Sequence, residues 1–279
     1  MIHLDNETLR QLQLIQLEML IEVDRICKKC DIHYNIIAGT LLGAVRHRGY
    51  IPWDDDADVA FLRSEYEKFR EACKTELDVT RFYFQDHRNT EGYRWGYGKL
   101  RRKDTLFLRE YQEHMPYEQG VFIDIFPLDG VPNNYIMRCF HNFHCFCVRK
   151  ILWSEVGKFA EQSLLMRKWY FILSKIPLKI VFKHYNKMIK HSNRNNNELV
   201  RILLFPTPNS IYGYYKKWYE QSMPIQFEKR FFEGIKDYKE YLNFKFGDFM
   251  KLPPREKRKV HPVSSIHLIK YKLWENNEK

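Results

Sequence analysis

The sequence predicts a mixed α+β fold in which a sheet core carries a basic helical insertion. Short apolar runs typical of strands alternate with amphipathic helical periods over the first 134 residues. From residue 135 to about residue 192 the period is helical, and most of the excess positive charge lies there. Hydrophobic residues make up 44% of the 279, so the chain can bury a core and is not disordered over most of its length.

The elements of the core follow from these periods in order. Asp5 is a good N-cap for an amphipathic helix over residues 5–30. A short strand over 34–38 ends at Gly39-Thr40, and a short helix over 41–47 follows. The later core elements are a strand over 56–62, a helix over 64–77, and strands over 82–85, 95–101 and 121–126.

The second half of the chain is predicted to be helical and then to return to the core. The helical period is interrupted at Pro177, and residues 193–197 are expected to form an exposed connection. We therefore divide the chain into a catalytic core over 1–134, a basic helical segment over 135–222, and a C-terminal return over 223–279 that completes the core and the site.

Several features predict a cytoplasmic protein. No stretch reaches the roughly 18 uninterrupted apolar residues of a membrane-spanning helix. The start, MIHLDNETLRQLQ, lacks the basic-then-apolar pattern of a secretory signal. The six cysteines are scattered, which favours reduced thiols over a disulfide framework.

The formal net charge of +11 could attract nucleic acid, anionic lipid or a phosphate-rich substrate. Between residues 149 and 194, eleven Lys or Arg stand against two Glu, and aromatic and aliphatic residues are interleaved with them. This composition is typical of a helix on an anionic membrane surface, so we expect peripheral contact through 149–194 at the inner face of the cell membrane. The alternative is an amphipathic helix packed on the core with its lysines in water.

The strongest chemical signal is the acidic run that precedes an apolar strand. Alternate side chains of a strand share one face, so Asp56 and Asp58 project together, and Asp54 joins them if the extended backbone begins early. Clustered carboxylates repel one another, and a divalent cation with oxygen ligands, Mg²⁺ or Mn²⁺ or Ca²⁺, removes that cost. The alternative is a solvated acidic turn, against which the apolar residues 59–61 argue.

Two further features predict a nucleotide-dependent enzyme. Gly39-Thr40 lies between a strand and a helix, where free backbone N–H groups and the helix dipole favour phosphate. Asp124 lies inside the apolar run VFIDIF, where a carboxylate needs a metal or a partner; a structural salt bridge is the alternative. A phosphate cradle, an alternating Asp pair and a third carboxylate are the layout of DNA-polymerase-beta-like nucleotidyltransferases.

The motif GTLLGAVRHRGYIPWDDDADV resembles the signature of the LicD family, the bacterial phosphocholine transferases related to fukutin and fukutin-related protein. FIDIFPLDG and GDFMKLPPREKR resemble its later motifs, and the resemblance runs from about residue 5 to residue 262. It implies a nucleotidyltransferase-like fold and transfer of a phosphorylated alcohol, usually phosphocholine from CDP-choline, to a cell-surface glycan. The residues that match the family's motifs are Gly39, Arg46, Asp54, Asp56, Asp58 and Asp124.

Basic and aromatic residues supply candidate substrate contacts. Arg46, and with less support His47 and Arg48, could hold a diphosphate, with a solvated loop as the alternative. Lys99 and Arg101 alternate along a strand and could face phosphate, although a solvated basic edge is equally expected.

Trp53, Trp95 and Tyr97 could stack on cytosine or surround a trimethylammonium group, unless they belong to the core. His261 follows a double proline, and the family resemblance places it back at the site.

These observations combine into one mechanistic hypothesis, a two-metal phosphoryl transfer with Mg²⁺ or Mn²⁺. Asp54, Asp56, Asp58 and Asp124 would bind metal, and Asp124 would also be the general base for a hydroxyl of a glycan or its lipid-linked precursor. Alternatives are transfer of another phospho-alcohol or phospho-sugar, a nucleotidyltransferase acting on nucleic acid, and a non-catalytic membrane-surface protein with structural calcium. We expect no nucleic-acid partner.

Overall fold

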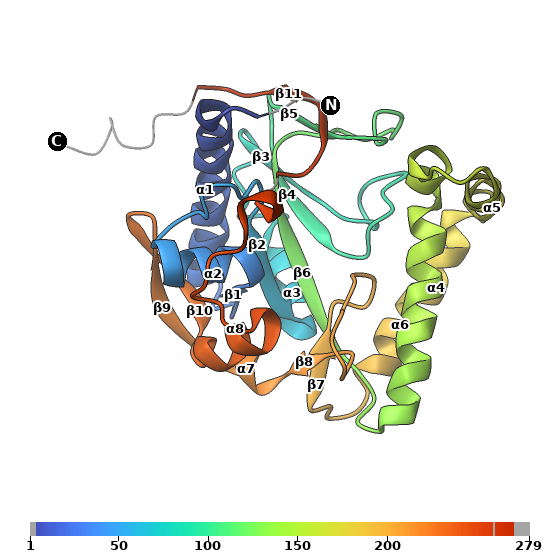
Figure 1. Ribbon diagram of the computed structural model, residues 1–279. Coiled ribbons are helices and arrows are strands. Elements are labelled where there is room, and N and C mark those ends of the chain that lie inside the picture. Colours follow the sequence, from blue (N-terminus) through green and yellow to red (C-terminus); the bar gives the residue numbers. More distant parts are fainter. Residues whose placement is uncertain (1–3, 259, 271–279) are drawn as a thin grey trace.

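The computed structural model describes residues 4–258 and 260–270, and it has a mixed α+β architecture built on a central sheet (Figure 1). Its strands are β1 (Asn35–Ile36), β2 (Asp58–Leu62), β3 (Phe82–Gln85), β4 (Gly98–Arg102), β5 (Leu106–Arg109), β6 (Phe122–Gly130), β7 (Leu199–Arg201), β8 (Tyr214–Tyr215), β9 (Ser222–Phe227), β10 (Arg230–Ile235) and β11 (Val263–His267). Its helices are α1 (Asn6–Lys29), α2 (Ala38–His47), α3 (Arg63–Ala72), α4 (Tyr135–Ala160), α5 (Leu164–Ser174), α6 (Leu178–Ser192), α7 (Lys217–Glu220) and α8 (Tyr238–Phe246).

The central sheet has the strand order β3-β4-β6-β2-β1-β10-β9, and β7 and β8 continue it from β6. The inner strands β2 and β6 run parallel, with Asp58 opposite Asp124, whereas β4 pairs antiparallel with β6 and sets Lys99 opposite Asp124. Every residue of β6 is buried, as expected for an apolar strand between two neighbours. Three sequence-distant residues that carry charge therefore meet at one level of the sheet.

Helix α1 is the long amphipathic helix that the sequence predicts. The Asp5 side chain accepts the backbone N–H of Thr8 at 2.7 Å and so caps the helix. Its apolar face packs on β4 and β6, and the same buried face includes two amides, Gln13 and Gln16. These two polar residues on an apolar face hold the acidic segment, as described below.

Several element boundaries differ from the sequence prediction. Helix α2 begins at Ala38, three residues early, with φ of 49° at that residue, so Gly39 and Thr40 lie in its first turn. Strand β2 begins at Asp58 and not at Asp56, and the carbonyls of Asp54 and Asp55 accept side-chain amides from α1 instead of ladder hydrogen bonds. Helix α3 ends at Ala72 and not at Leu77.

Residues 135–192 of the basic segment form three helices, α4, α5 and α6, that stand beside the sheet (Figure 1). The predicted interruption at Pro177 is present, and a second break at 161–163, which the sequence prediction missed, separates α4 from α5. Helices α4 and α6 enclose a small core of their own, which includes Val148, Leu152 and Tyr185. The three helices end at Ser192, as the helical period of the sequence predicts, and after the connection at 193–197 the strands β7 and β8 return the chain to the sheet.

The C-terminal part adds strands that the sequence analysis did not identify. The hairpin β9–β10 extends the sheet through a parallel pairing of β10 with β1, and β11 pairs with β5. The pairing of β11 brings the segment after the double proline next to the acidic run.

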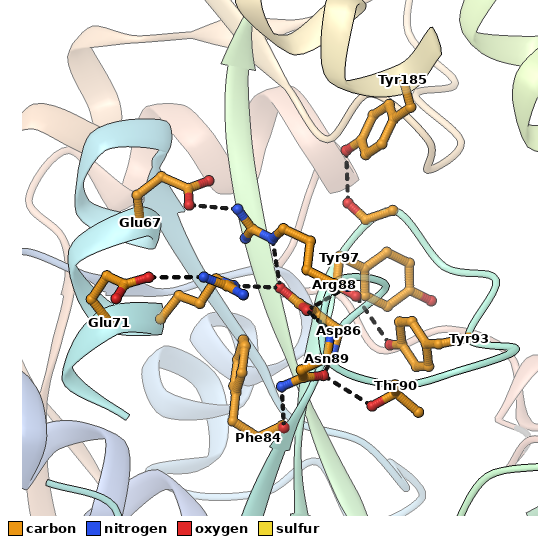
Figure 2. Close-up of polar contacts among 12 residues, drawn as sticks. Glu67, Glu71, Phe84, Asp86, Arg88, Asn89, Thr90, Tyr93, Tyr97 and Tyr185 are labelled. Carbon is orange, nitrogen blue, oxygen red and sulfur yellow. Dashed lines mark hydrogen bonds and ion pairs between the residues drawn. The ribbon is translucent and has the colours of Figure 1, made fainter. Parts of the chain in front are cut away.

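The loop between β3 and β4 is fastened by a network of charges (Figure 2). The carboxylate of Asp86 accepts hydrogen bonds from Arg70 and Arg88, both at 3.0 Å, and Arg88 also pairs with Glu67. At the far end of the loop, the hydroxyl of Tyr185 on α6 donates to the carbonyl of Gly96 at 2.8 Å. The loop is therefore fixed at both ends before it enters β4.

Candidate active site

Asp58 and Asp124 lie side by side at the centre of the site. They are register partners on the parallel strands β2 and β6, and side chains of paired residues point to the same face of a sheet. The backbone N–H of Asp58 donates to the hydroxyl of Thr40 at 2.8 Å, and its carbonyl accepts the N–H of Ile37 at 3.1 Å. The first turn of α2 therefore fixes the position of Asp58.

Asp54 and Asp56 reach the same place from the segment before β2. The amide of Gln13 donates to the carbonyl of Asp54 at 3.0 Å, and that of Gln16 to the carbonyl of Asp55 at 2.8 Å. A Cβ atom added to Gly39 would lie 2.8 Å from Oδ2 of Asp54, so only glycine leaves room for this carboxylate at the start of α2.

We call Asp54, Asp56, Asp58 and Asp124 the acidic cluster, because their charges act on one another. Burial, followed by the charge of Asp56, raises the pKa of Asp58 well above its usual value, and Asp124 and Asp54 add to the effect. Burial and then Asp56 likewise raise the pKa of Asp54, and burial and then Asp55 raise the pKa of Asp56. The predicted convergence of these carboxylates is what the structure shows.

The acidic cluster fits a hard divalent cation. Its own ligand atoms are carboxylate oxygens, the donors that Mg²⁺ and Mn²⁺ prefer, and Nδ1 of His261 lies 3.9 Å from Oδ2 of Asp56. The half-buried carboxylates of Asp54 and Asp58, whose pKa values are raised, repel their neighbours, and a cation removes that cost while it displaces their protons. Lys99, which forms an ion pair with Asp124, neutralises one member only.

Asp55 does not belong to the acidic cluster, and its carboxylate binds the C-terminal segment. It is buried, and it accepts hydrogen bonds from Arg109 at 2.9 Å and from Nδ1 of His261 at 2.7 Å. Ligand atoms of Asp55, Asp56 and His261 lie within 4.8 Å of one another, but the carboxylate of Asp55 is already used by its two partners. His261 therefore returns to the site, as the family resemblance implies, through a contact with Asp55.

A cavity of about 690 Å³ opens beside the cluster and is large enough for a nucleotide-sized ligand. Asp56, Asp124, Lys99, Arg101 and His261 all line it. Burial lowers the pKa of Lys99 to about 8. The aromatic residues that line the cavity are Trp95, Tyr97, Phe107, Tyr111, Phe122, Trp153 and Phe205. Its other cationic residues are Arg94, Arg109, Arg149 and Lys150.

Two of the predicted contact residues, Arg101 and Thr40, are hydrogen-bonded to other parts of the protein. Arg101 lines the cavity, yet its guanidinium donates to the side chain of Gln85 and the carbonyl of Gly120. The hydroxyl of Thr40 is buried against the backbone of Asp58. Both side chains are therefore engaged in holding the walls of the site.

The predicted residues around the end of α2 form a separate group. Arg46 donates to the carbonyl of Phe249 at 2.7 Å, and His47 lies edge-on to Trp53 with ring centroids 6.2 Å apart. Arg258 lies over Trp53, 4.7 Å from its ring centre. The exposed Arg48 ends α2 in a left-handed conformation.

This group thus joins α2 to the C-terminal loop and does not line the cavity. Burial, followed by the charge of Arg258, lowers the pKa of Arg46.

The sequence analysis missed four residues that build the site. Gln13 and Gln16 position the acidic segment, and the signal was available, since two amides interrupt the apolar face of α1. Asp55 and Arg109 pair across 54 positions, which only the tertiary structure reveals.

Comparison with known proteins finds similarity both over the region of this site and over nearly the whole chain. The family model described as LicD/FKTN/FKRP, nucleotidyltransferase domain, matches residues 31–151, which include the whole acidic cluster. The lipopolysaccharide cholinephosphotransferase LicD of Haemophilus influenzae is 29% identical over 94% of this chain and 98% of its own length. An uncharacterised protein of Rickettsia typhi is 40% identical over 54 residues, covering 19% of this chain and 18% of its own. Residues 31–151 therefore match the nucleotidyltransferase domain of the LicD family, and the chain is similar to a LicD protein over 94% of its length.

Proposed function

We propose that this protein is a metal-dependent transferase that moves phosphocholine from CDP-choline to a hydroxyl of a cell-surface glycan or its lipid-linked precursor. The observation that carries the proposal is the convergence of the acidic cluster beside a cavity with cationic and aromatic walls. The full-length similarity to a lipopolysaccharide cholinephosphotransferase supports the choice of donor and acceptor.

The cluster would hold Mg²⁺ or Mn²⁺, which would supply positive charge to the diphosphate of the donor during transfer. Asp124, which lines the cavity, would accept the proton of the attacking hydroxyl, and Lys99 orients it through their ion pair. Arg109, fixed by Asp55 at the cavity wall, presents charge to the phosphates.

The aromatic walls suit the transferred group. A trimethylammonium ion is recognised by the faces of aromatic rings, and Trp95 and Tyr97 belong to the wall that the β3–β4 loop supplies. The same cavity could take another phospho-alcohol or a phospho-sugar, so the identity of the donor needs a direct comparison.

The proposal is tested by the transfer reaction itself. Incubation with a panel of CDP-alcohols and other nucleotide donors, Mg²⁺ and a glycan acceptor should release CMP fastest from CDP-choline. Asp56→Ala and Asp58→Ala should each lower the transfer rate by about 10³-fold or more. Each variant would remove a carboxylate ligand of the cation whose charge would stabilise the transition state. Asp237→Ala, an exposed acid at the start of α8, is the matched control and should keep full activity.

Circular dichroism would establish that the variants stay folded. Near-normal transfer by either Asp56→Ala or Asp58→Ala would refute the assignment of the cluster, and a preference for a sugar nucleotide would replace phosphocholine as the transferred group.

A further inference from the structure

Helix α5 is an apolar helix that packs on α4 through one side and leaves most of its side chains exposed. Among its residues only Tyr170 is buried, while Leu165 is 77% exposed, Trp169 52% and Ile172 59%. These three share one side of the helix, at i, i+4 and i+7. Leu164, Met166 and Phe171 are exposed as well. An exposed apolar surface of this kind marks an interaction site in a folded protein.

The outer side of α4 continues this apolar surface. Helix α5 covers the C-terminal half of α4. Tyr170 of α5 packs so closely on Gly157 of α4 that a Cβ atom added to Gly157 would lie 2.8 Å from the Tyr170 ring. Helix α5 does not cover the N-terminal half of α4, where Ile136, Phe140 and Phe143 are each at least 64% exposed. These residues follow one another at i, i+4 and i+7, so they form a second exposed stripe.

The charge around α5 indicates what covers it. Between Glu161 and Glu198 the chain contains eight Lys or Arg and no acidic residue. Arg167 and Lys168 lie on α5 itself, both exposed, and Lys175 and Lys179 follow it directly. A second copy of the same surface would bring like charges together, whereas an anionic bilayer offers both an apolar phase and negative headgroups.

We propose that α5, with the outer stripe of α4, lies in the interface of an anionic membrane. No helix among the described residues is long and apolar enough to cross a bilayer, and the 11 residues of α5 extend about 16 Å against about 30 Å of hydrocarbon. The geometry is that of an interfacial helix, whose apolar side chains enter the headgroup region while its Lys and Arg contact phosphate.

The position of α5 agrees with this role. Figure 1 shows α5 at the outer edge of the molecule, on the far side of α4 from the sheet. Helix α4 contributes Arg149, Lys150 and Trp153 to the cavity wall, and Lys150 also donates to the hydroxyl of Tyr170 at 2.8 Å. If the proposed function holds, membrane binding brings the cavity to a lipid-linked acceptor.

Flotation with lipid vesicles tests the membrane contact without any activity measurement. The full chain should float with phosphatidylcholine vesicles that contain one quarter phosphatidylglycerol, and much less with phosphatidylcholine alone. The double variant Leu165→Glu/Trp169→Glu should bind at least about tenfold more weakly, because it removes two inserted side chains and adds repulsion. Phe231→Glu, 61% exposed on β10 across the molecule, should bind like the unaltered chain.

A second variant separates charge from insertion. Lys168→Glu/Lys175→Glu should lose the preference for phosphatidylglycerol and the dependence on salt, with the apolar residues intact. Melting curves would show that all variants are folded, as expected from their exposed positions.

Absence of flotation at low salt, or equal flotation of the Leu165→Glu/Trp169→Glu variant, would overturn the proposal. A dimer in light scattering that this variant abolishes, without vesicle binding, would overturn it in favour of a second copy. Transfer to a water-soluble acceptor, measured in parallel, tests the proposed function separately from the membrane contact.

Discussion

At Gly39 the first turn of α2 passes so close to Asp54 that a side chain does not fit. Gly39→Ala would place a Cβ 2.8 Å from Oδ2 of Asp54, and the carboxylate, as the free end of its side chain, would move away. We expect transfer to fall about tenfold or more and the Mg²⁺ requirement to rise, with little change in melting temperature. Rates measured across a Mg²⁺ titration check this.

Gly247→Ala is the contrasting variant for that experiment. Nothing lies within 4 Å of the position, but its φ of 70° strains any side chain, so stability should fall by about 1 kcal/mol while activity stays. Equal activity and metal dependence in Gly39→Ala and the unaltered chain would show that Gly39 does not set the position of Asp54.

At the scale of elements, the β3–β4 loop joins the cavity to the helical segment. One end is held by the network around Asp86 (Figure 2), and His87 next to it stacks on Phe182 of α6 with ring centroids 4.3 Å apart. Because this loop carries Trp95 and Tyr97, its attachment to α6 determines the shape of the aromatic wall.

That attachment predicts a dependence of stability on pH. Burial lowers the pKa of His87 to about 4, and its Nε2 is buried without a partner among the described residues. Between about pH 6.5 and pH 4 the unfolded chain binds a proton here and the folded chain does not, so stability falls as pH falls, by up to about 3 kcal/mol. Urea unfolding at pH 7 and pH 4.5 measures the loss.

His87→Phe keeps the stacking and removes the titrating group, so it should lose less stability in acid than the unaltered chain. His267→Phe, at an exposed position on β11, should lose as much as the unaltered chain. The same acid sensitivity in His87→Phe would assign the effect to another group, such as His141, whose pKa burial also lowers to about 4.

At the scale of the whole molecule, the acidic cluster should destabilise the metal-free fold. Mg²⁺ at about 100 times its dissociation constant should add about 2.7 kcal/mol and raise Tm by several degrees. Asp58→Asn removes one half-buried charge from the cluster, so without metal it should melt at or above the temperature of the unaltered chain.

With Mg²⁺ the order of the two melting temperatures should reverse, because the cation would stabilise the unaltered chain and would stabilise Asp58→Asn only a little. Thermal melts with Mg²⁺ and with a chelator measure both effects. Identical gains from Mg²⁺ in the two proteins would place the cation elsewhere.

Features that depend on neighbouring residues could be predicted from the sequence. The helical period and cap of α1, the limits of β3, and the interruption at Pro177 are properties of neighbouring residues, and the structure confirms them. The spacing of the acidic run and the apolar surroundings of Asp124 likewise predicted carboxylates that need a shared partner.

Contacts between residues that are far apart in the sequence could be determined only from the tertiary structure. The register that sets Asp58 opposite Asp124, the pair of Asp55 with His261, and the use of Arg46 at the C-terminal loop depend on which surfaces pack together. The sequence shows that α5 is apolar and basic, but its exposure follows only from the fact that no other described element covers it. Periodicity specifies which face of an element avoids water, whereas the partner of that face is a property of the whole chain.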